Sequence, residues 1–303
     1  MRLGLMTAAL PMLTLDQLAT WAAESGYQML EIACWPAEGP SRRYGGVSHI
    51  DCETIDAAKA RAIRALITGN GLDISSLGYY PNPLDPDPAV SDAAFTHIKH
   101  VIDAAVLLEV EIVGTFIGAD PKRSNEQNLE TFAKVWPPVI AYAAERGIKI
   151  AIENCPMLWP DTWPGGTNLA TTPAIWKRMF EIIPSDNFGL NYDPSHLVWQ
   201  FIDYIRPIHE FREKLFHVHA KDMRVDRDLL YQDGVLGCGF RWAIPKLPGL
   251  GDVNWNAFTS ALYEVGYDFV ISVEHEDRSF EGTEEAIKRG FYLTHDVLKP
   301  LIH

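Results

Sequence analysis

Four acidic or imidazole side chains stand where predicted β-strands end. They are Glu153 in AIENCP, Asp193 in NYDPSH, His219 in HVHAKD and Glu274 in SVEHED. Three carboxylates and one imidazole form an oxygen-rich donor set that suits Mn²⁺, Mg²⁺ or Co²⁺, with positions left open for substrate oxygens. Without a cation, three clustered carboxylates would repel one another and lose solvation. The set therefore predicts one divalent metal ion, with Mn²⁺ preferred and Mg²⁺, Co²⁺ or Zn²⁺ as alternatives.

The segment FHVHAKDM, residues 216–223, carries three ionisable side chains on one strand face. Alternation along a strand points His217, His219 and Lys221 to the same side. Such a face indicates either an exposed sheet edge or the polar interior of a cavity. In a closed barrel the three residues would be graded by depth. We then expect His217 in the packed layer, His219 at the metal and Lys221 towards the substrate.

These residues need a scaffold in which several strand ends meet at one place. Eight short β-rich runs alternate with longer helical patterns, which predicts an α/β fold of the (β/α)₈ TIM barrel type, as a single domain over residues 1–303. An open doubly wound sheet is the alternative, but no GxGxxG follows the first strand. The strands are expected at 2–8, 29–34, 72–79, 111–117, 148–153, 188–193, 215–221 and 269–274.

Helix start and stop signals accompany this alternation. Thr14 and Ser124 precede helical segments that end at Gly26 and Gly147, and the pair Pro137 and Pro138 predicts a break inside the second segment. The long stretch 222–253 after the seventh strand predicts an ordered insertion over the barrel mouth. Further helices are expected at about 53–69, 91–108, 173–183, 200–212, 254–265 and 281–298.

Composition and charge narrow the functional classes. The chain has 303 residues, 47% of them hydrophobic, and a formal charge of −14 from 26 basic and 40 acidic residues. This charge opposes nucleic-acid binding, because binding to nucleic acid depends on neutralising phosphates with basic side chains. No apolar stretch approaches the ~20 residues of a membrane span. The four scattered cysteines and the absence of a signal-peptide pattern predict a cytoplasmic protein.

The ordered series Glu153, Asp193-Pro-Ser-His196, His217-Val-His219 and Glu274 resembles the xylose isomerase-like TIM-barrel superfamily. The segment PGLGDVNW at 248–255 is also similar to a Gly-rich segment of that superfamily. The group includes sugar phosphate isomerases and epimerases, ketose 3-epimerases and inosose dehydratases. The resemblance implies metal ligation by Glu153, Asp193, His219 and Glu274.

The resemblance also implies an isomerase or epimerase that acts on a sugar or cyclitol carbonyl. Glu153 and Glu274 would be the catalytic pair: one carboxylate removes a proton, the other returns one, and the metal holds the enediolate oxygens. Two departures from ketose 3-epimerases keep alternatives open. A substrate-binding Glu of those enzymes falls on Trp159, and a substrate-binding Arg falls on Val225, one place from Arg224.

Three alternatives therefore remain. The first is a lyase or hydratase, such as a dehydratase or a keto-glycoside eliminating enzyme, that uses the same enolate. The second is an endonuclease-IV-like phosphodiesterase, which would need a larger His-rich metal cluster and a basic groove. The third is a non-catalytic sugar-binding subunit of a larger complex.

The expected partner is a small sugar or cyclitol, and a homo-oligomer is possible on sequence grounds. No Gly-rich phosphate cradle is evident, which favours an unphosphorylated substrate. Aromatic side chains would stack on a sugar face, and polar ones would bind its hydroxyl groups. The residues expected to contact substrate are His196, Lys221, Arg224, Glu31, Trp35 and Tyr79.

Overall fold

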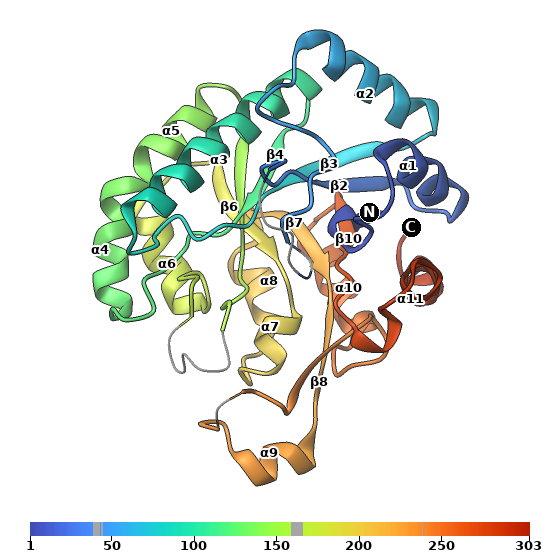
Figure 1. Ribbon diagram of the computed structural model, residues 1–303. Helices are drawn as coiled ribbons and strands as arrows, with labels where there is room; N and C mark the ends of the chain where they lie inside the picture. The colour runs from blue at the N-terminus through green and yellow to red at the C-terminus, as the bar shows by residue number, and fades with distance from the viewer. Residues whose placement is uncertain (39–42, 44, 159–165, 238) are drawn as a thin grey trace.

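The computed structural model describes residues 1–38, 43, 45–158, 166–237 and 239–303. Eight parallel strands close into a barrel in the order β1-β10-β7-β6-β5-β4-β3-β2, which confirms the predicted TIM barrel (Figure 1). All eight predicted strands are present, and no strand begins or ends more than two residues from its predicted bound. They are β1 (Arg2–Met6), β2 (Met29–Ala33), β3 (Asp73–Gly78), β4 (Ile112–Thr115), β5 (Lys149–Glu153), β6 (Phe188–Tyr192), β7 (Leu215–Ala220) and β10 (Val270–Val273).

Helices surround the barrel, and several begin at the predicted caps. The hydroxyls of Thr14 and Ser124 accept hydrogen bonds from the backbone N–H groups of Gln17 and Gln127. In return, the side-chain oxygens of these glutamines accept from the backbone N–H groups of the two cap residues. The predicted break lies at Trp136, between α4 and α5. The main helices are α1 (Leu15–Glu24), α2 (Ala57–Gly69), α3 (Pro88–Leu108), α4 (Asn125–Val135), α5 (Pro137–Ala144), α6 (Pro173–Ile182), α10 (Trp255–Glu264) and α11 (Glu284–Leu298).

The helix predicted at 200–212 is wrong over most of its length. Two short helices, α7 (Ser195–Val198) and α8 (Arg206–Glu210), occupy this region. Phe201 has a left-handed backbone with a φ of 57°, a conformation that ends a right-handed helix. Helix α8 begins at Arg206, and Pro207 lies in its first turn, where proline is tolerated. Short 3₁₀ helices are η1 (Thr7–Ala9), η2 (Arg212–Lys214), η3 (Arg278–Phe280) and η4 (Lys299–Leu301).

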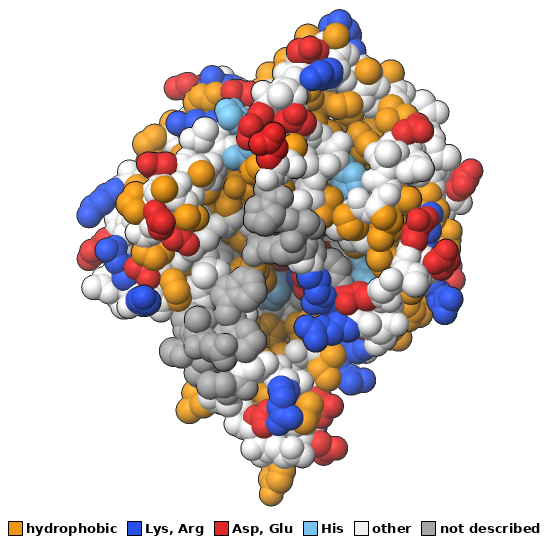
Figure 2. Space-filling model, viewed as in Figure 1, with side chains coloured by type: hydrophobic (Ala, Val, Ile, Leu, Met, Phe, Trp, Pro, Cys, Tyr) orange, Lys and Arg blue, Asp and Glu red, His pale blue; other side chains and the backbone are white. Residues whose placement is uncertain are grey.

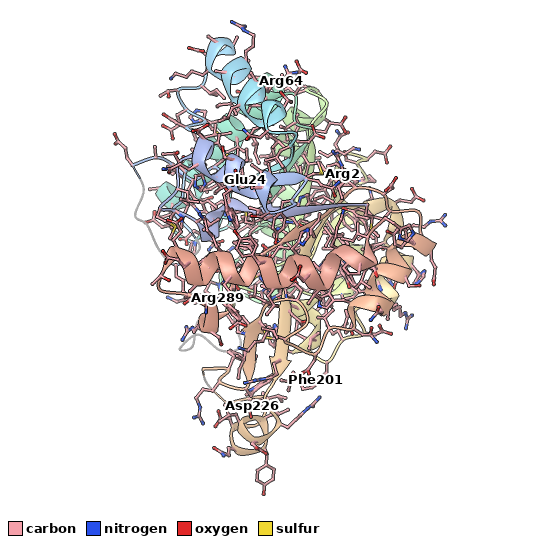
Figure 3. The ribbon with its side chains drawn as sticks, turned by 90° about the vertical axis from the view of Figure 1, so that its right-hand side faces the viewer. Arg2, Glu24, Arg64, Phe201, Asp226 and Arg289 are labelled. Atoms are coloured by element: carbon pink, nitrogen blue, oxygen red, sulfur yellow. The ribbon has the colours of Figure 1, made fainter. Side chains whose placement is uncertain are left out.

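The predicted insertion after the seventh barrel strand is confirmed. Strands β8 (Asp222–Val225) and β9 (Ala243–Lys246) pair antiparallel, with helix α9 (Arg227–Asp233) between them. We call residues 222–253 the arm; it projects from one end of the molecule, where Figure 3 labels Asp226 (Figures 1 and 3).

The Asp222 carboxylate fastens the two ends of the arm together. Its Oδ1 accepts hydrogen bonds from the backbone N–H groups of Met223 at 2.8 Å and Val253 at 3.0 Å. Its Oδ2 accepts from the backbone N–H of Gly249 at 3.1 Å and from the indole N–H of Trp255 at 2.9 Å. The arm therefore leaves and rejoins the barrel at a single buried side chain.

The barrel interior leaves space for polar side chains near its carboxyl end. A Cβ atom added to Gly114 would lie 2.4 Å from the Tyr80 hydroxyl, and one added to Gly78 would lie 3.1 Å from Glu31 Oε1. Glycine at these two positions therefore admits Tyr80 and Glu31 into the interior. Outside the barrel, Trp136 and Trp176 are completely buried between helices and strands. Among the described residues, no helix is long and apolar enough to cross a membrane.

Candidate metal centre

The four strand-end residues singled out by sequence meet inside the barrel mouth. Glu153 ends β5, Asp193 follows β6, His219 lies near the end of β7 and Glu274 follows β10. These four strands are consecutive neighbours in the closed barrel, so their carboxyl ends lie side by side. One donor atom from each residue lies within 4.8 Å of the others. The side chains of Glu153, Asp193 and His219 are almost completely buried.

The residue after β5 holds Asp193 in place. Asp193 donates its backbone N–H to Asn154 Oδ1, and its carbonyl accepts from Asn154 Nδ2, both at 2.8 Å. The backbone N–H of Ser195 donates to Asp193 Oδ1 at 2.8 Å. These contacts fix the carboxylate and leave Oδ2 directed at the cluster.

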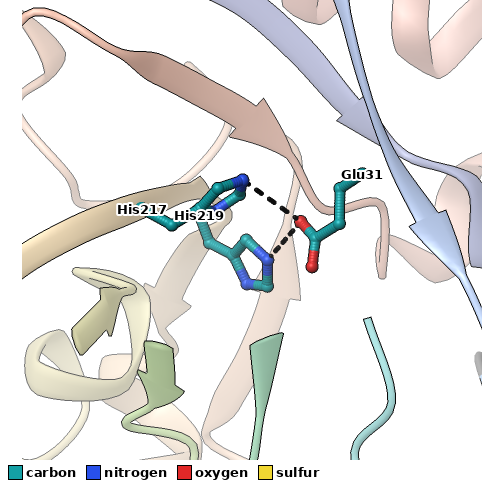
Figure 4. A group of neighbouring side chains, drawn as sticks. All are labelled: Glu31, His217 and His219. Carbon is teal, nitrogen blue, oxygen red and sulfur yellow. Dashed lines mark hydrogen bonds and ion pairs between the residues drawn. The ribbon is translucent and has the colours of Figure 1, made fainter. Parts of the chain in front are cut away.

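A buried carboxylate from the opposite side of the barrel orients His219. Glu31 Oε2 lies 2.8 Å from His219 Nε2 and accepts a hydrogen bond from the Ser272 hydroxyl at 3.0 Å. The Tyr80 hydroxyl donates to the other oxygen, Glu31 Oε1, at 2.5 Å. The contact between Glu31 and His219 favours the proton on Nε2 (Figure 4). The other ring nitrogen, Nδ1, lies 3.1 Å from Glu274 Oε2. A histidine held in this way is typical of metal ligands.

His217 lies deeper in the barrel, as expected from the strand alternation. Its side chain is 1% exposed, with Nδ1 2.9 Å from Asn191 Oδ1 and Nε2 3.1 Å from the Ser75 hydroxyl. Burial lowers the pKa of His217 to about 4, although the Glu31 charge partly opposes that shift. His217 is therefore a neutral, hydrogen-bonded residue of the packed interior, 3.9 Å from Glu31.

The Lys221 ammonium lies among the carboxylates. Its Nζ is 2.6 Å from Glu274 Oε2, 3.1 Å from Asp193 Oδ2, 3.5 Å from Glu276 Oε2 and 3.6 Å from Glu153 Oε1. One cation facing four carboxylates leaves an excess of negative charge in a buried site. That excess still favours a divalent cation, which would compete with the ammonium for the same oxygens.

The two glutamates of the cluster differ in their affinity for a proton. Burial alone raises the pKa of Glu153, but Lys221, His196 and His219 outweigh burial and hold that pKa well below its ordinary value. Burial and the charge of Glu153 together raise the pKa of Glu274, with Lys221 and His219 opposing them. Glu274 therefore binds a proton more readily than Glu153 does.

Several donor atoms in this site suit a metal ion. Among the described residues, buried side-chain atoms with no hydrogen-bond partner include Glu153 Oε1, Asp193 Oδ2 and His219 Nδ1. A fourth such atom, His196 Nε2, lies 3.2 Å from Asp193 Oδ2 and 3.3 Å from Glu153 Oε1. Buried polar atoms without partners are costly, and a cation would satisfy them together. The buried Glu and His cluster thus indicates a divalent-metal site.

A cavity of about 480 Å³ opens above this cluster. Glu153, Glu274 and three of the residues expected to contact substrate, Trp35, His196 and Lys221, line it. The arm adds Met223, Phe240, Ala243 and Pro245 to its wall. On the face drawn in Figure 2, basic and acidic side chains are interspersed rather than gathered into a basic stripe.

The other residues expected to contact substrate lie elsewhere. Tyr79 packs against His97, with ring centroids 4.6 Å apart, while the next residue, Tyr80, lines the cavity. Arg224 is exposed on β8. Glu31 is fully buried and directs its oxygens at His219, Tyr80 and Ser272, beneath the cavity. Trp159 lies outside the described residues.

Sequence reasoning did not find two arginines that line this cavity, Arg43 and Arg278. Arg43 donates through Nη2 to the Glu276 carbonyl at 3.0 Å and through Nε to Glu281 Oε1 at 2.9 Å. Both arginines lie in connections that follow strands. In such segments no hydrophobic periodicity indicates which way a side chain points.

Comparison with known sequences agrees with the family resemblance of the strand-end motifs. A sequence model described as xylose isomerase-like TIM barrel matches residues 19–294. The uncharacterised protein YfiH of Bacillus subtilis strain 168 is 24% identical over 310 residues, covering 91% of this chain and 93% of YfiH. The inosose dehydratase of Geobacillus thermodenitrificans is 26% identical over 155 residues, which span 50% of this chain and 49% of the relative.

Solved structures share the fold at low sequence identity. The D-psicose 3-epimerase of Clostridium cellulolyticum H10, solved with D-tagatose, has a TM-score of 0.74 and 17% identity, with full coverage of both chains. The IolI protein, solved with a zinc atom, has a TM-score of 0.73 and 19% identity, covering 100% of this chain and 99% of that one.

Proposed function

The chain belongs to the xylose isomerase-like TIM-barrel family, a family of enzymes that includes sugar epimerases and dehydratases, and on that premise we propose that it is a metal-dependent isomerase or epimerase of a sugar or cyclitol carbonyl compound. One observation carries the proposal. The carboxylates of Glu153 and Glu274 both lie close to His219: Glu153 Oε1 is 3.7 Å and Glu274 Oε2 is 3.1 Å from His219 Nδ1. Both glutamates line the cavity above.

In this proposal Glu153, Asp193, His219 and Glu274 hold one divalent ion, with Mn²⁺ preferred. The chemistry that such an ion supplies when bound is polarisation of a substrate carbonyl, which acidifies the adjacent C–H bond. Glu31 is a positioning residue for His219, since both of its oxygens are occupied below the cavity. This role replaces the sugar contact expected from the sequence.

The proton transfers use the difference between the two glutamates. Glu153, ionised at neutral pH because its pKa is lowered, accepts the proton from the carbon next to the carbonyl. Glu274, whose pKa is raised, returns a proton to the opposite face of that carbon. Neighbouring carboxylates raise the pKa of Lys221 well above its ordinary value despite burial, so Lys221 remains an ammonium ion. It stabilises the negative charge on the substrate oxygen and takes no part in the proton transfer.

Elimination of water is the second candidate, because inosose dehydratases are among the sequence relatives. The first step would be the same removal of a proton by Glu153. The proton held by Glu274 would then go to a departing hydroxyl group on the next carbon, and the product would be an unsaturated ketone and water. The two reactions differ in where the second proton is placed, and elimination also breaks the C–O bond of the departing hydroxyl group.

Deuterium incorporation separates the two candidates. The enzyme is incubated in D₂O with Mn²⁺ and a panel of ketoses, inososes and 3-keto-glycosides, and products are followed by NMR and mass spectrometry. Epimerisation gives deuterium at the inverted carbon with no change in the carbon skeleton. An unsaturated product would establish elimination instead and overturn the epimerase proposal.

Two variants test the assigned roles. Glu153→Gln and Glu274→Gln should each lower turnover about 10²- to 10⁴-fold, the contribution of a positioned acid or base. Glu276→Gln is the matched control, since Glu276 also contacts Lys221 but is not assigned a proton transfer. If the wild type turns over no compound of the panel while metal and sugar still bind, the chain is a sugar-binding protein and the catalytic proposal fails. If a turnover is found and Glu153→Gln leaves it unchanged, the role assigned to Glu153 is wrong.

A further inference from the structure

A second group of metal-binding side chains lies outside the barrel mouth. Glu53 stands in the connection between β2 and α2, and His97 and His100 lie one turn apart on α3. Glu53 Oε1 is 3.1 Å from His97 Nδ1 and 4.0 Å from His100 Nδ1. One donor atom from each residue lies within 4.8 Å of the others. None of these residues belongs to the cluster formed by Glu153 and its neighbours.

Hydrogen bonding fixes the proton positions on His97. Its Nε2 lies 2.8 Å from the carbonyl oxygen of Cys34, which can only accept, so Nε2 carries a hydrogen. In the neutral ring, Nδ1 then presents a lone pair to the Glu53 carboxylate. Two acceptors in contact repel each other. A positive charge, either a proton or a metal ion, must therefore lie between them.

His100 distinguishes these two possibilities. Its Nδ1 atom is buried and is among the described atoms that lack a hydrogen-bond partner, although the ring as a whole is 41% exposed. A proton on His97 would satisfy His97 and Glu53 but would leave His100 Nδ1 unused. A metal ion between the three residues satisfies all of them.

The spacing suits a small tetrahedral ion. Zinc bonds of 2.0–2.2 Å to nitrogen and oxygen place neighbouring ligands about 3.3 Å apart. The distance from Glu53 to His97 already matches that value. The distance from Glu53 to His100 is longer by less than 1 Å, and both of those side chains are partly exposed. Two imidazoles and a carboxylate are ligands for Zn²⁺ or Co²⁺, with water in the fourth position.

We propose that Glu53, His97 and His100 form a second, structural metal site that binds Zn²⁺ or Co²⁺. The site would fasten the connection between β2 and α2 to helix α3. The start of that connection bears Trp35, which lines the substrate cavity and follows Cys34, the residue bonded to His97. Tyr79 contacts both His97 and Trp35. A metal ion here would therefore stiffen one wall of the cavity without entering it.

Metal titration tests the proposal independently of any catalytic activity. In full-length protein carrying Glu153→Gln and Asp193→Asn, the barrel-mouth site is disabled. Calorimetric titration with Zn²⁺ alone should still reveal one equivalent. Adding His100→Ala or Glu53→Gln should weaken that binding more than 100-fold, beyond the 10- to 100-fold effect of indirect partners. His209→Ala is the matched control, because His209 is an exposed helix histidine 3.8 Å from Glu264.

Two further readouts keep the result clear if a combined variant folds poorly. Wild-type protein should bind two equivalents of Zn²⁺, and the single variant His100→Ala should bind one and retain its activity. Co²⁺ in the second site should give the visible absorption of a tetrahedral complex. The proposal is overturned if the wild type binds one equivalent that Glu153→Gln with Asp193→Asn removes, or if His100→Ala leaves the stoichiometry unchanged.

Discussion

Replacing Glu31 with glutamine tests how a buried carboxylate that does not enter the cavity controls the metal centre. Glutamine keeps the shape of the side chain but removes its charge. In the wild type, Glu31 Oε2 holds His219 through Nε2 at 2.8 Å, while Ser272 and Tyr80 fix the carboxylate. In the variant an amide oxygen can still accept from Nε2. The expected loss is therefore that of the charge, with the geometry preserved.

Two effects of this substitution oppose each other. Losing the carboxylate makes the imidazole a weaker ligand, and losses of an outer partner cost about 10- to 100-fold in metal affinity, or about 1.4 to 2.7 kcal/mol. Burial lowers the pKa of His219, but Glu31 and Glu274 raise it more, and the net pKa lies well above its ordinary value. Removing Glu31 lowers that pKa and weakens proton competition for Nδ1. The affinity loss should therefore be greatest at high pH and shrink as the pH falls.

The measurement is Mn²⁺ affinity from pH 6 to pH 9, by calorimetry on metal-free protein. Ser272→Ala is a graded control, because it removes one hydrogen bond to Glu31 and keeps the charge, so its effect should be smaller. Circular dichroism establishes that each variant is folded. A Glu31→Gln protein that binds Mn²⁺ within twofold of wild type at the highest pH would refute the reasoning, as would a loss that grows towards low pH.

Three other substitutions test further contacts of the structure. Lys221→Met should raise the metal affinity at least tenfold and lower the thermal midpoint of the metal-free protein. Both effects are expected because four carboxylates lose the cation that they share. Thermal scans with and without Mn²⁺ measure them. His217 is neutral in the folded protein, where its pKa is about 4, against 6.5 in the unfolded chain. The free energy of unfolding should therefore fall by about 3 kcal/mol as the pH is lowered from 6.5 to 4. Urea titrations of His217→Gln should show a smaller fall. Trp136→Ala should lower the free energy of unfolding by about 3 to 5 kcal/mol in urea titrations, since the completely buried ring also donates to the Ile117 carbonyl at 3.1 Å.

The strands and most helices were predictable because their signals are local. Buried parallel strands give continuous apolar runs, and the caps at Thr14 and Ser124 lie next to the helices that they start. The strand-end residues Glu153, Asp193, His219 and Glu274 were predictable for a related reason: parallel strands in a barrel must end at one face. The helix expected at 200–212 failed where the backbone at Phe201 adopts a left-handed conformation that the sequence does not mark.

Contacts between residues distant in sequence could not be read from periodicity. Glu31 and His219 are 188 residues apart, and nothing near either one indicates their hydrogen bond. Tyr79 was expected at the substrate as an aromatic residue near a strand end, but β3 ends at Gly78 and it is the next residue, Tyr80, that lines the cavity. Arg43 reaches the cavity from an irregular connection, where direction depends on tertiary contacts alone.

The hydrogen bonds to Asp222 hold both ends of the arm, so the arm can be replaced as one segment. Residues 223–252 depart from and return to one carboxylate, which bonds to both ends of the excursion and to the first residue of α10. A graft that keeps Asp222, Gly249, Gly251, Val253 and Trp255 would retain these bonds while replacing Phe240, Ala243 and Pro245 in the cavity wall. Gly251 must stay, because a Cβ atom there would lie 2.2 Å from Asp222 Oδ1. Such a graft would change the part of the cavity wall that the arm supplies without altering the strands that carry the candidate metal ligands.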